Sequence, residues 1–184
     1  MIEVEKKFQP TEEQLAKLLK DSIFLKEVTN HDVIYDYPDY RLISKSIRLR
    51  LRNGKFELKT SNENAGYASL EIENEAEIKK YFNITSSIAD FVKENLIEGM
   101  NIKTFRKKFK KGDFVIDVDE LDFGYKCVEI ELLVKDQSEI PRARGKIIEL
   151  AKKYNFELKD IPHKKKEYFR IVKPEVYKLL YPDK

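Results

Sequence analysis

The sequence contains a single cysteine, Cys127, and it lacks the long apolar runs and targeting signals that define several protein classes. One cysteine cannot form an internal disulfide, which favours a reducing, cytoplasmic location. The first residues carry no basic segment followed by an apolar run, so no signal peptide is expected. No stretch approaches the roughly 18 consecutive apolar residues of a spanning helix, so we expect a soluble protein with no membrane partner.

Several kinds of site are also missing. The motif Gly-x-x-x-x-Gly-Lys-Ser/Thr does not occur, which excludes a conventional phosphate-binding loop. His31 and His163 are isolated, and no Cys/His spacing suggests zinc. The net charge of +3 over 184 residues is too small to attract nucleic acid in bulk. A nucleic-acid partner is therefore not favoured, and Cys127 is expected to pack as a small apolar residue.

Two lysine-rich stretches are interpreted as surface. Residues 103–111 interleave basic and aromatic side chains, and we expect an exposed strand end with a solvated lysine tail, Arg106 being the exception. Residues 163–166 are treated in the same way, apart from Lys164. Tyr35, Tyr37 and Phe8 are expected to be aromatic residues of the core or its rim.

The dominant pattern is the period-two alternation of β-strands. Asn53-Gly54 lies between two alternating runs and predicts a tight hairpin turn, and Lys111-Gly112 predicts a second one. Eight strands with short connections predict an antiparallel β-barrel or a tightly curled antiparallel sheet. The predicted strands span residues 2–8, 31–37, 46–52, 55–60, 67–74, 103–110, 113–120 and 127–134.

Four helices are predicted between and after these strands. Thr11 to Gln14 form a capping box that opens the first helix, and the second begins near Ser86 or Ser87. The third spans about residues 141–154, and Pro174 starts a short fourth helix. No linker divides the chain. The predicted fold is α+β, with one domain over residues 1–184 and helices packed outside an eight-stranded barrel.

Alternation separates an apolar face from a charged face in nearly every strand, because neighbouring strand residues point to opposite sides. Ordinary solvent faces mix Thr, Ser, Gln and Lys, whereas these faces hold almost only Arg, Lys, Asp and Glu. Helices could cover the apolar faces, which would leave the charged faces lining a wide barrel. The alternating charged sets are Glu3, Glu5 and Lys7; Arg48, Arg50 and Arg52; Glu57 and Lys59; Glu71 and Glu73; Asp117 and Asp119; and Glu129 and Glu131.

A charged interior needs a charged ligand, because unpaired buried charge costs several kcal/mol per ion. Arginine and lysine suit phosphate oxygens, and clustered carboxylates suit a hard divalent cation such as Mg²⁺. A triphosphate with its metal ion supplies both charges. The alternative is an ordinary sheet with these faces in solvent.

Glu3-Val4-Glu5-Lys6-Lys7 resembles the Glu-x-Glu-x-Lys signature of the CYTH, or triphosphate tunnel metalloenzyme, superfamily. The resemblance continues in family order through Arg48 and Arg50, Glu57-Leu58-Lys59, Glu71, Arg106, Asp117-Val118-Asp119, Glu129-Ile130-Glu131 and Lys164. Within the superfamily the chain looks most like the thiamine triphosphatases. The segments that carry this closer resemblance are Ile2 to Phe8, Glu57 to Lys59 and Asp122-Phe123-Gly124-Tyr125.

The resemblance implies an eight-stranded tunnel and a metal-dependent hydrolase that cleaves thiamine triphosphate to thiamine diphosphate and phosphate. Lys7 is assigned a catalytic role as well as substrate binding. The implied cofactor is Mg²⁺, or Mn²⁺. The implied triphosphate-binding residues are Lys7, Arg48, Arg50, Lys59, Arg106 and Lys164, and the implied metal-facing residues are Glu3, Glu5, Glu71, Asp117, Asp119, Glu129 and Glu131.

Other functions stay open at this point. Ile34 stands where better-known thiamine triphosphatases tend to carry tyrosine, so inorganic tripolyphosphate is an alternative substrate. An adenylate cyclase of the same superfamily would convert ATP to cyclic AMP and pyrophosphate. A non-catalytic module that binds polyphosphate or RNA ends is a third alternative. The sequence is compatible with a monomer or a homodimer.

Overall fold

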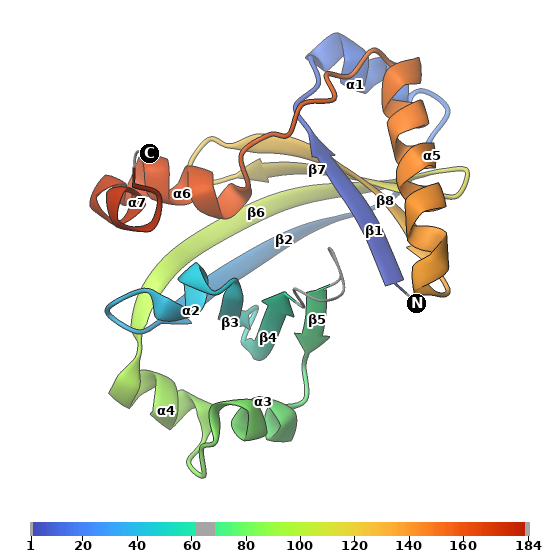
Figure 1. Ribbon diagram of the computed structural model, residues 1–184. Coiled ribbons are helices and arrows are strands. Elements are labelled where there is room, and N and C mark those ends of the chain that lie inside the picture. Colours follow the sequence, from blue (N-terminus) through green and yellow to red (C-terminus); the bar gives the residue numbers. More distant parts are fainter. Residues whose placement is uncertain (1, 62–68, 183–184) are drawn as a thin grey trace. The chain divides into compact units, whose positions relative to one another are not determined.

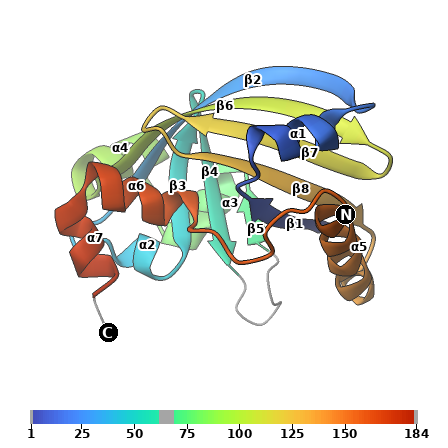
Figure 2. The ribbon, with the colours of Figure 1, turned by 90° about the horizontal axis from the view of Figure 1, so that it is seen from above.

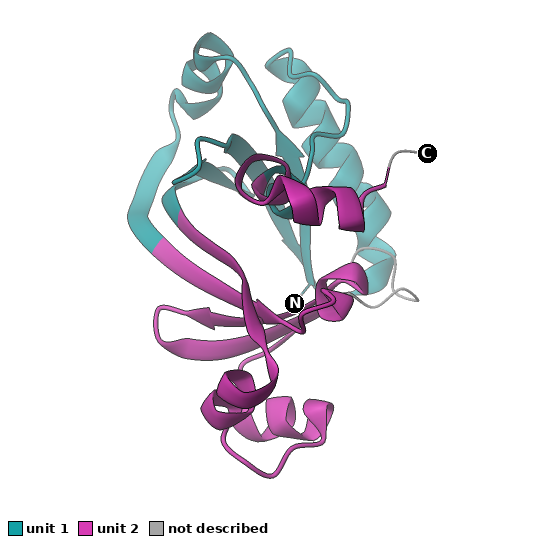
Figure 3. Ribbon diagram, turned by 90° about the vertical axis from the view of Figure 1, so that its left-hand side faces the viewer, with its two compact units in different colours: residues 1–29, 104–167 teal, residues 30–103, 168–184 magenta. Residues whose placement is uncertain are grey.

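The computed structural model describes residues 2–61 and 69–182 (Figure 1). The chain forms two compact units, each built from two separate segments (Figure 3). Unit 1 comprises residues 1–29 and 104–167, and unit 2 comprises residues 30–103 and 168–184. None of the described helices is both long and apolar enough to span a membrane. The single domain predicted over residues 1–184 stays a prediction.

Eight strands form one sheet in the order β1-β8-β7-β6-β2-β3-β4-β5. The β1–β8, β8–β7, β7–β6, β2–β3, β3–β4 and β4–β5 pairs are all antiparallel. The strands β2 (Ile23–Asp36) and β6 (Ile97–Lys111) each run through both units. The predicted α+β class with an eight-stranded antiparallel sheet is therefore confirmed.

Unit 1 packs one long helix, α5, against strands β1 and β8 (Figures 1 and 2). Their apolar faces meet α5 in a core that contains Phe8, Ile130 and Ile147, each at most 1% exposed. Besides parts of β2, β6 and α6, the elements of unit 1 are β1 (Ile2–Phe8), α1 (Glu12–Leu19), β7 (Phe114–Leu121), β8 (Lys126–Val134), the 3₁₀ turn η2 (Gln137–Glu139) and α5 (Ile140–Lys153).

Local signals fix the edges of these elements as predicted. The Thr11 side chain accepts a hydrogen bond from the Gln14 backbone N–H, and the Gln14 side chain accepts one from Thr11, which completes the capping box of α1. Lys111 pairs with Phe114 around a two-residue turn, in which Gly112 has a φ of 58°. Glycine adopts that left-handed conformation without a steric cost.

Unit 2 covers the apolar face of strands β3 and β4 with the helices α3 and α4. Leu49 and Leu58 face Ile78 and Ile88 across this core, and all four are fully buried. Besides parts of β2, β6 and α6 (Lys164–Val172), the elements of unit 2 are α2 (Arg41–Ser44), β3 (Ile47–Arg52), β4 (Lys55–Ser61), β5 (Ser69–Ile72), α3 (Glu75–Phe82), α4 (Ile88–Asn95) and α7 (Pro174–Leu180).

The predicted Asn53-Gly54 turn is present, with φ values of 47° and 86°. The sequence analysis did not predict a buried side chain that fixes the loop after β2. The buried carboxylate of Asp36 accepts hydrogen bonds from the backbone N–H groups of Tyr37, Leu42 and Ile43. This carboxylate fixes the loop and the single helical turn α2 that lead into β3 and its arginines.

The sequence analysis did not predict three of the helices, and it predicted β2 and β6 too short. Helix α2 is one turn with no side-chain cap, and α6 begins with three consecutive lysines, so neither shows a clear apolar stripe. Helix α3 has a sequence signal, because the Asn74 side chain accepts a hydrogen bond from the Glu77 N–H at its start. The prediction instead extended a strand to residue 74, whereas β5 ends at Ile72.

Candidate functional site

The charged face of unit 1 is built by the register of four adjacent strands. Lys7 of β1 pairs with Glu129 of β8, which pairs with Asp117 of β7, which pairs with Lys108 of β6. The neighbouring row joins Cys127, Asp119 and Arg106. These rows bring together six carboxylates and four cations, here called the unit 1 cluster: Glu3, Glu5, Lys7, Arg106, Lys108, Asp117, Asp119, Glu129, Glu131 and Lys164.

Glu129 is the best-neutralised carboxylate of the unit 1 cluster. Its oxygens lie 2.7 Å from Lys164 Nζ, 2.9 Å from Arg106 Nη2 and 3.2 Å from Lys7 Nζ. Burial opposes ionisation, but these three cations hold the pKa of Glu129 well below its ordinary value. Glu129 is therefore a permanent anion that holds three positive side chains in place.

Arg106 and Lys164 also contact Asp119. The Arg106 Nε and Nη2 groups both donate to the Asp119 carboxylate at 2.7 Å, which is a bidentate pair. Lys164 Nζ donates to the same carboxylate. Burial works against their charge, but the surrounding carboxylates raise the pKa values of Arg106 and Lys164 above their ordinary values. Both side chains remain cationic at any physiological pH.

Asp117 is less well satisfied. Its side chain is fully buried, and Lys108 Nζ lies 2.8 Å from Oδ1 while Arg106 Nη1 contacts Oδ2. Neither contact has hydrogen-bond geometry, and both carboxylate oxygens lack a hydrogen-bond donor. Asp117 is therefore held mainly by charge attraction to Lys108 and Arg106, and its oxygens can accept a further cation.

Glu131, two residues after Glu129 on the same strand face, has the opposite electrostatic environment. Its nearest cation, Lys108 Nζ, is 3.5 Å away. Burial, followed by the negative charges of Asp117 and Glu3, raises the pKa of Glu131 to about 8. The unit 1 cluster therefore has more negative charge around Glu131 than its own cations compensate.

These residues fit the divalent metal ion implied by the resemblance. Ligand oxygens of Asp117, Glu129 and Glu131 lie within 4.8 Å of one another, and so do those of Glu3, Glu5 and Glu131. Carboxylate oxygens are the preferred protein ligands of Mg²⁺ and suit Mn²⁺ equally. A cation bound by the first group would also meet the two Asp117 oxygens that accept no hydrogen bond.

Lys164 reaches the cluster from the start of α6, after a segment that contains no regular secondary structure. The Tyr125 hydroxyl donates to the Pro162 carbonyl at 2.6 Å, and Lys6 Nζ lies 2.5 Å from Asp160. These contacts attach the segment before α6 to β1 and to the turn before β8. They position the Lys164 ammonium against Asp119 and Glu129.

Unit 2 carries a second charged face, here called the unit 2 cluster. Arg50 is buried, with Nε 2.7 Å and Nη2 2.5 Å from Glu57 Oε2. Arg52 makes a bidentate pair with Asp32 at 2.6 and 2.8 Å. This cluster has four cations and three carboxylates: Arg48, Arg50, Arg52, Lys59, Asp32, Glu57 and Glu71.

Glu71, predicted to face a metal ion, lies in the unit 2 cluster with basic neighbours. Its carboxylate is 2.7 Å from Lys59 Nζ and 3.9 Å from Arg50 Nη2. Burial opposes ionisation, but Lys59 and then Arg50 hold the pKa of Glu71 below its ordinary value. Ile34, the departure from the thiamine triphosphatase pattern, pairs with Arg50 across β2 and β3 and is buried.

Sequence reasoning missed several charged residues of these clusters. The prediction of an exposed lysine tail is wrong for Lys108, whose position two residues after Arg106 on one strand face was the available signal. Asp32, Arg52 and Glu57 form ion pairs in the unit 2 cluster, Arg52 with Asp32 and Glu57 with Arg50, and they were not singled out as site residues.

Cys127 was expected to pack as an apolar residue. It is buried, but it shares the charged face with Asp119 and Glu129, so the apolar environment was wrong. Burial raises the pKa of its thiol to about 12, so the thiol is not an activated nucleophile. Phe8 lies in the core of unit 1, and Tyr35 and Tyr37 lie at the rim of the unit 2 core, as predicted.

The fold and the two clusters place the protein among α+β proteins in which one face of an antiparallel sheet gathers charges of both signs. Residues 1–163 match the CYTH domain, and the chain belongs to that family. The family resemblance inferred from the ordered charged motifs is therefore confirmed, at the level of the family.

Solved structures share this fold. A protein from Pyrococcus horikoshii OT3 is 25% identical, with a TM-score of 0.63, over 84% of this chain and 91% of that one. A candidate adenylate cyclase from Vibrio parahaemolyticus is 21% identical, with a TM-score of 0.61, over 89% and 94% of the two chains. A candidate adenylyl cyclase from Hippeastrum, described as having a dominant triphosphatase activity, is 18% identical, with a TM-score of 0.58, over 92% and 94%.

Proposed function

We propose that this protein is a metal-dependent hydrolase that cleaves the terminal phosphoanhydride bond of a triphosphate. Thiamine triphosphate is the first candidate substrate, from the sequence resemblance, and inorganic tripolyphosphate is the alternative. The observation that carries the proposal is the unit 1 cluster, in which buried carboxylates, an unsatisfied Asp117 and permanent cations share one strand face. Such a cluster is stabilised by a ligand that brings a cation and an anion together.

The proposed metal ligands are Asp117, Glu129 and Glu131, with Glu3, Glu5, Asp119 and Glu71 as further carboxylates on the charged faces. When bound, a divalent ion supplies charge compensation for the phosphate oxygens and lowers the pKa of a bound water. Mg²⁺ is the first candidate and Mn²⁺ the second. Their carboxylate preferences are too similar for this cluster to separate them.

The cations are proposed to bind and orient the phosphates. Phosphoryl transfer needs positioning and charge stabilisation more than covalent chemistry, which suits side chains with fixed positive charge. Lys7 is proposed to contact the terminal phosphate. Burial opposes its charge, but Glu129 and Glu5 raise the pKa of Lys7, so the ammonium can donate without losing its proton at neutral pH. Arg48, Arg50, Lys59, Arg106 and Lys164 are the other proposed phosphate-binding residues.

Adenylate cyclase activity is the second candidate, because two of the similar structures are described as candidate cyclases. A cyclase would release pyrophosphate and cyclic AMP from ATP, whereas a hydrolase releases inorganic phosphate. Product analysis after incubation with ATP separates these two activities directly.

The decisive test is phosphate release from thiamine triphosphate, tripolyphosphate and ATP, each with Mg²⁺ and with Mn²⁺, at neutral and alkaline pH. We expect turnover to depend on the metal ion. Lys7→Ala and Arg50→Ala should each reduce turnover by about a hundredfold or more without unfolding the protein. Lys17→Ala is the control for Lys7, because Lys17 lies on α1, outside the unit 1 cluster, and pairs with the exposed Glu13. Near wild-type rates in both variants would refute the proposal.

A further inference from the structure

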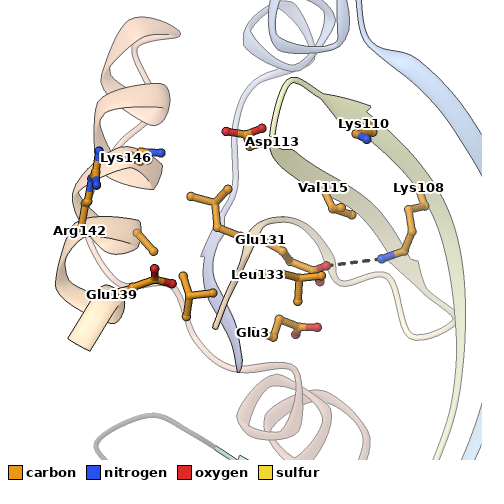
Figure 4. A pocket seen from close by; sticks show the side chains of 13 residues that line it. Glu3, Lys108, Lys110, Asp113, Val115, Glu131, Leu133, Glu139, Arg142 and Lys146 are labelled. Atoms are coloured by element: carbon orange, nitrogen blue, oxygen red, sulfur yellow. Dashed lines mark hydrogen bonds and ion pairs between the residues drawn. The ribbon is translucent and has the colours of Figure 1, made fainter. Parts of the chain in front are cut away.

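The face of β6 opposite the unit 1 cluster carries a pattern that the proposed function does not use. Lys108 reaches the carboxylates of the cluster, and Figure 4 shows its side chain extending toward Glu131. Neighbouring strand residues point to opposite sides, so Phe105, Lys107 and Phe109 lie on the other face. A lysine therefore stands between two phenylalanines on that side of the strand.

This other face is the apolar side of the sheet in unit 1, and it becomes exposed along β6. Helix α5 packs against β1 and β8. Phe109, which pairs with Ile116 of β7, is partly buried against the same core. Phe105, four residues earlier on β6, is 46% exposed. One exposed aromatic residue would be ordinary, whereas a group of them indicates a binding surface.

Strand β2, the neighbour of β6 in the sheet, repeats this pattern (Figure 2). Phe24 is 54% exposed and meets Phe109 edge to face, with the ring centroids 5.5 Å apart. Lys26, two residues further along β2, is on the side of the strand that carries Phe24, and it is exposed. Two exposed rings and two exposed lysines thus lie together on adjacent strands. They are here called the β2–β6 platform: Phe24, Lys26, Phe105 and Lys107.

The lysines of the platform have no counter-ions. Lys26 and Lys107 form no ion pair with any residue that the structure describes. Glu120, the β7 partner of Phe105, is already paired with Lys126 at 3.2 Å. The platform is therefore locally positive, although the net charge of the whole chain is only +3. This local arrangement makes the platform complementary to an anion.

These charges decide which kind of partner the platform fits. A second copy of the chain, docked about a two-fold axis, would bring the same unpaired lysines together, which is unfavourable. Insertion into a membrane needs apolar groups that project beyond their charged neighbours, whereas each ring here stands beside a longer lysine side chain. A single-stranded nucleic acid offers flat bases to the rings and phosphates to the lysines.

We infer that the β2–β6 platform binds single-stranded nucleic acid. Bases stack on Phe24 and Phe105, and phosphates pair with Lys26 and Lys107. Every base has a flat face, so contacts of this kind accept RNA and DNA of varied sequence. A duplex keeps these faces inside its own stack and binds more weakly. The platform residues on β6 point away from the unit 1 cluster, so this binding does not depend on the proposed triphosphate hydrolysis.

The test measures, by fluorescence anisotropy, the Kd of labelled oligo(dT) and oligo(U) of about 15 nucleotides with 5′-hydroxyl ends. The wild type should bind both in low salt. Phe105→Ala should raise each Kd about tenfold, because it removes one stacking ring at an exposed position. Lys107→Ala should reduce the magnitude of the slope of log K against log salt concentration by about 0.7, the contribution of one phosphate contact on a single strand.

Tyr81→Ala on α3 and Lys93→Ala on α4 are the matched controls. Tyr81 has the same 46% exposure as Phe105, and Lys93 is exposed and forms no ion pair with a described residue. Both controls should leave the Kd and the salt slope unchanged. An excess of tripolyphosphate with Mg²⁺ should not displace the oligonucleotide, because it belongs to the charged face.

The inference is overturned if the wild type binds neither oligonucleotide, if Phe105→Ala leaves the Kd unchanged, or if tripolyphosphate displaces the oligonucleotide. It is equally overturned if the only effect of Phe105→Ala is to dissociate a dimer in sedimentation velocity, or to abolish binding to phosphatidylserine vesicles. Each of these outcomes leaves the proposed function standing, since phosphate release is measured separately. Failure of phosphate release, in turn, leaves the oligonucleotide measurements valid.

Discussion

The two charged clusters follow the same strand alternation and differ in how their charges are balanced. The unit 1 cluster sets six carboxylates against four cations, and four of its carboxylates, Asp117, Asp119, Glu129 and Glu131, are buried. The unit 2 cluster sets three carboxylates against four cations, and its most buried cation is Arg50. The unit 1 cluster therefore has an excess of negative charge and the unit 2 cluster an excess of positive charge.

This difference assigns distinct roles to residues of the same type. In the unit 1 cluster, burial and the neighbouring carboxylates raise the pKa of Glu131. A bound cation would reduce the repulsion between these carboxylates. Each carboxylate of the unit 2 cluster pairs with an arginine or a lysine, so these carboxylates serve as counter-ions that hold basic side chains in place. A phosphate group would compete with these counter-ions for the same cations.

The largest expected effect is the difference in turnover between a variant at a proposed metal ligand and a variant at a counter-ion. Asp117→Asn removes a proposed metal ligand, and we expect turnover to fall by about a hundredfold or more. Glu57→Gln removes the partner of Arg50 in unit 2, and it should change turnover by less than about threefold while lowering KM, because Arg50 is then released for phosphate. Steady-state kinetics with tripolyphosphate measures both. Equal losses in the two variants would show that the clusters do not differ in this way.

A medium effect is expected in the pH dependence of stability of the metal-free protein. The folded-state pKa of Glu131 is raised from 4.5 to about 8, so its stabilising contribution is complete below pH 4.5 and is lost as the pH rises through about 8. The melting temperature should therefore fall by a few degrees between pH 6 and pH 9. Glu131→Gln should flatten this fall, and so should Mg²⁺, which compensates the same charge.

The pKa of Glu71, in the unit 2 cluster, is shifted in the opposite direction to that of Glu131, so Glu71 serves as the control. Its folded-state pKa is lowered, so its contribution to stability is present above its ordinary value of 4.5 and is lost at lower pH. Glu71→Gln should lower the melting temperature at neutral pH by a smaller amount, and the difference from wild type should disappear in acid. A flat profile for the metal-free wild type between pH 6 and pH 9 would contradict the electrostatic description of Glu131.

The smallest expected effect concerns Cys127, which shares a strand row with Asp119 and Arg106 of the unit 1 cluster and has no counterpart in the unit 2 cluster. Because burial raises the pKa of its thiol to about 12, iodoacetamide at pH 8 should modify it only after unfolding. Cys127→Ala should retain activity within about threefold, since the thiol is not a proposed ligand or nucleophile. Rapid labelling of the folded protein, followed by mass spectrometry, would show that this row of the cluster is open to solvent.

The sequence predicted what depends on local periodicity and capping. All eight strands, the Asn53-Gly54 turn and the capping box at Thr11 are confirmed, because each arises from neighbouring residues. It could not predict which charges pair, because that depends on strand register. Lys108 belongs to the unit 1 cluster only through its pairing with Asp117, and Glu71 has basic neighbours only through its pairing with Lys59.

The change from charge to aliphatic side chains along the charged face of unit 1, at Val115 and Leu133, was visible in the sequence. Three apolar residues in succession, at 114–116 and at 132–134, look like ordinary strand composition until the face that each one joins is known. The same limitation applied to Cys127, whose neighbours are set by the β7–β8 register.

The pairing of β1 with β8 has a consequence for how the protein is made. Ile2 pairs with Val134, so β1 has no partner until β8, the last of the described strands along the chain, has been synthesised. The β3–β4 hairpin, closed by Asn53-Gly54, can form earlier, because its contacts are local. The strand that carries Glu3, Glu5 and Lys7 thus precedes the other described strands in the chain and is among the last to find its partner.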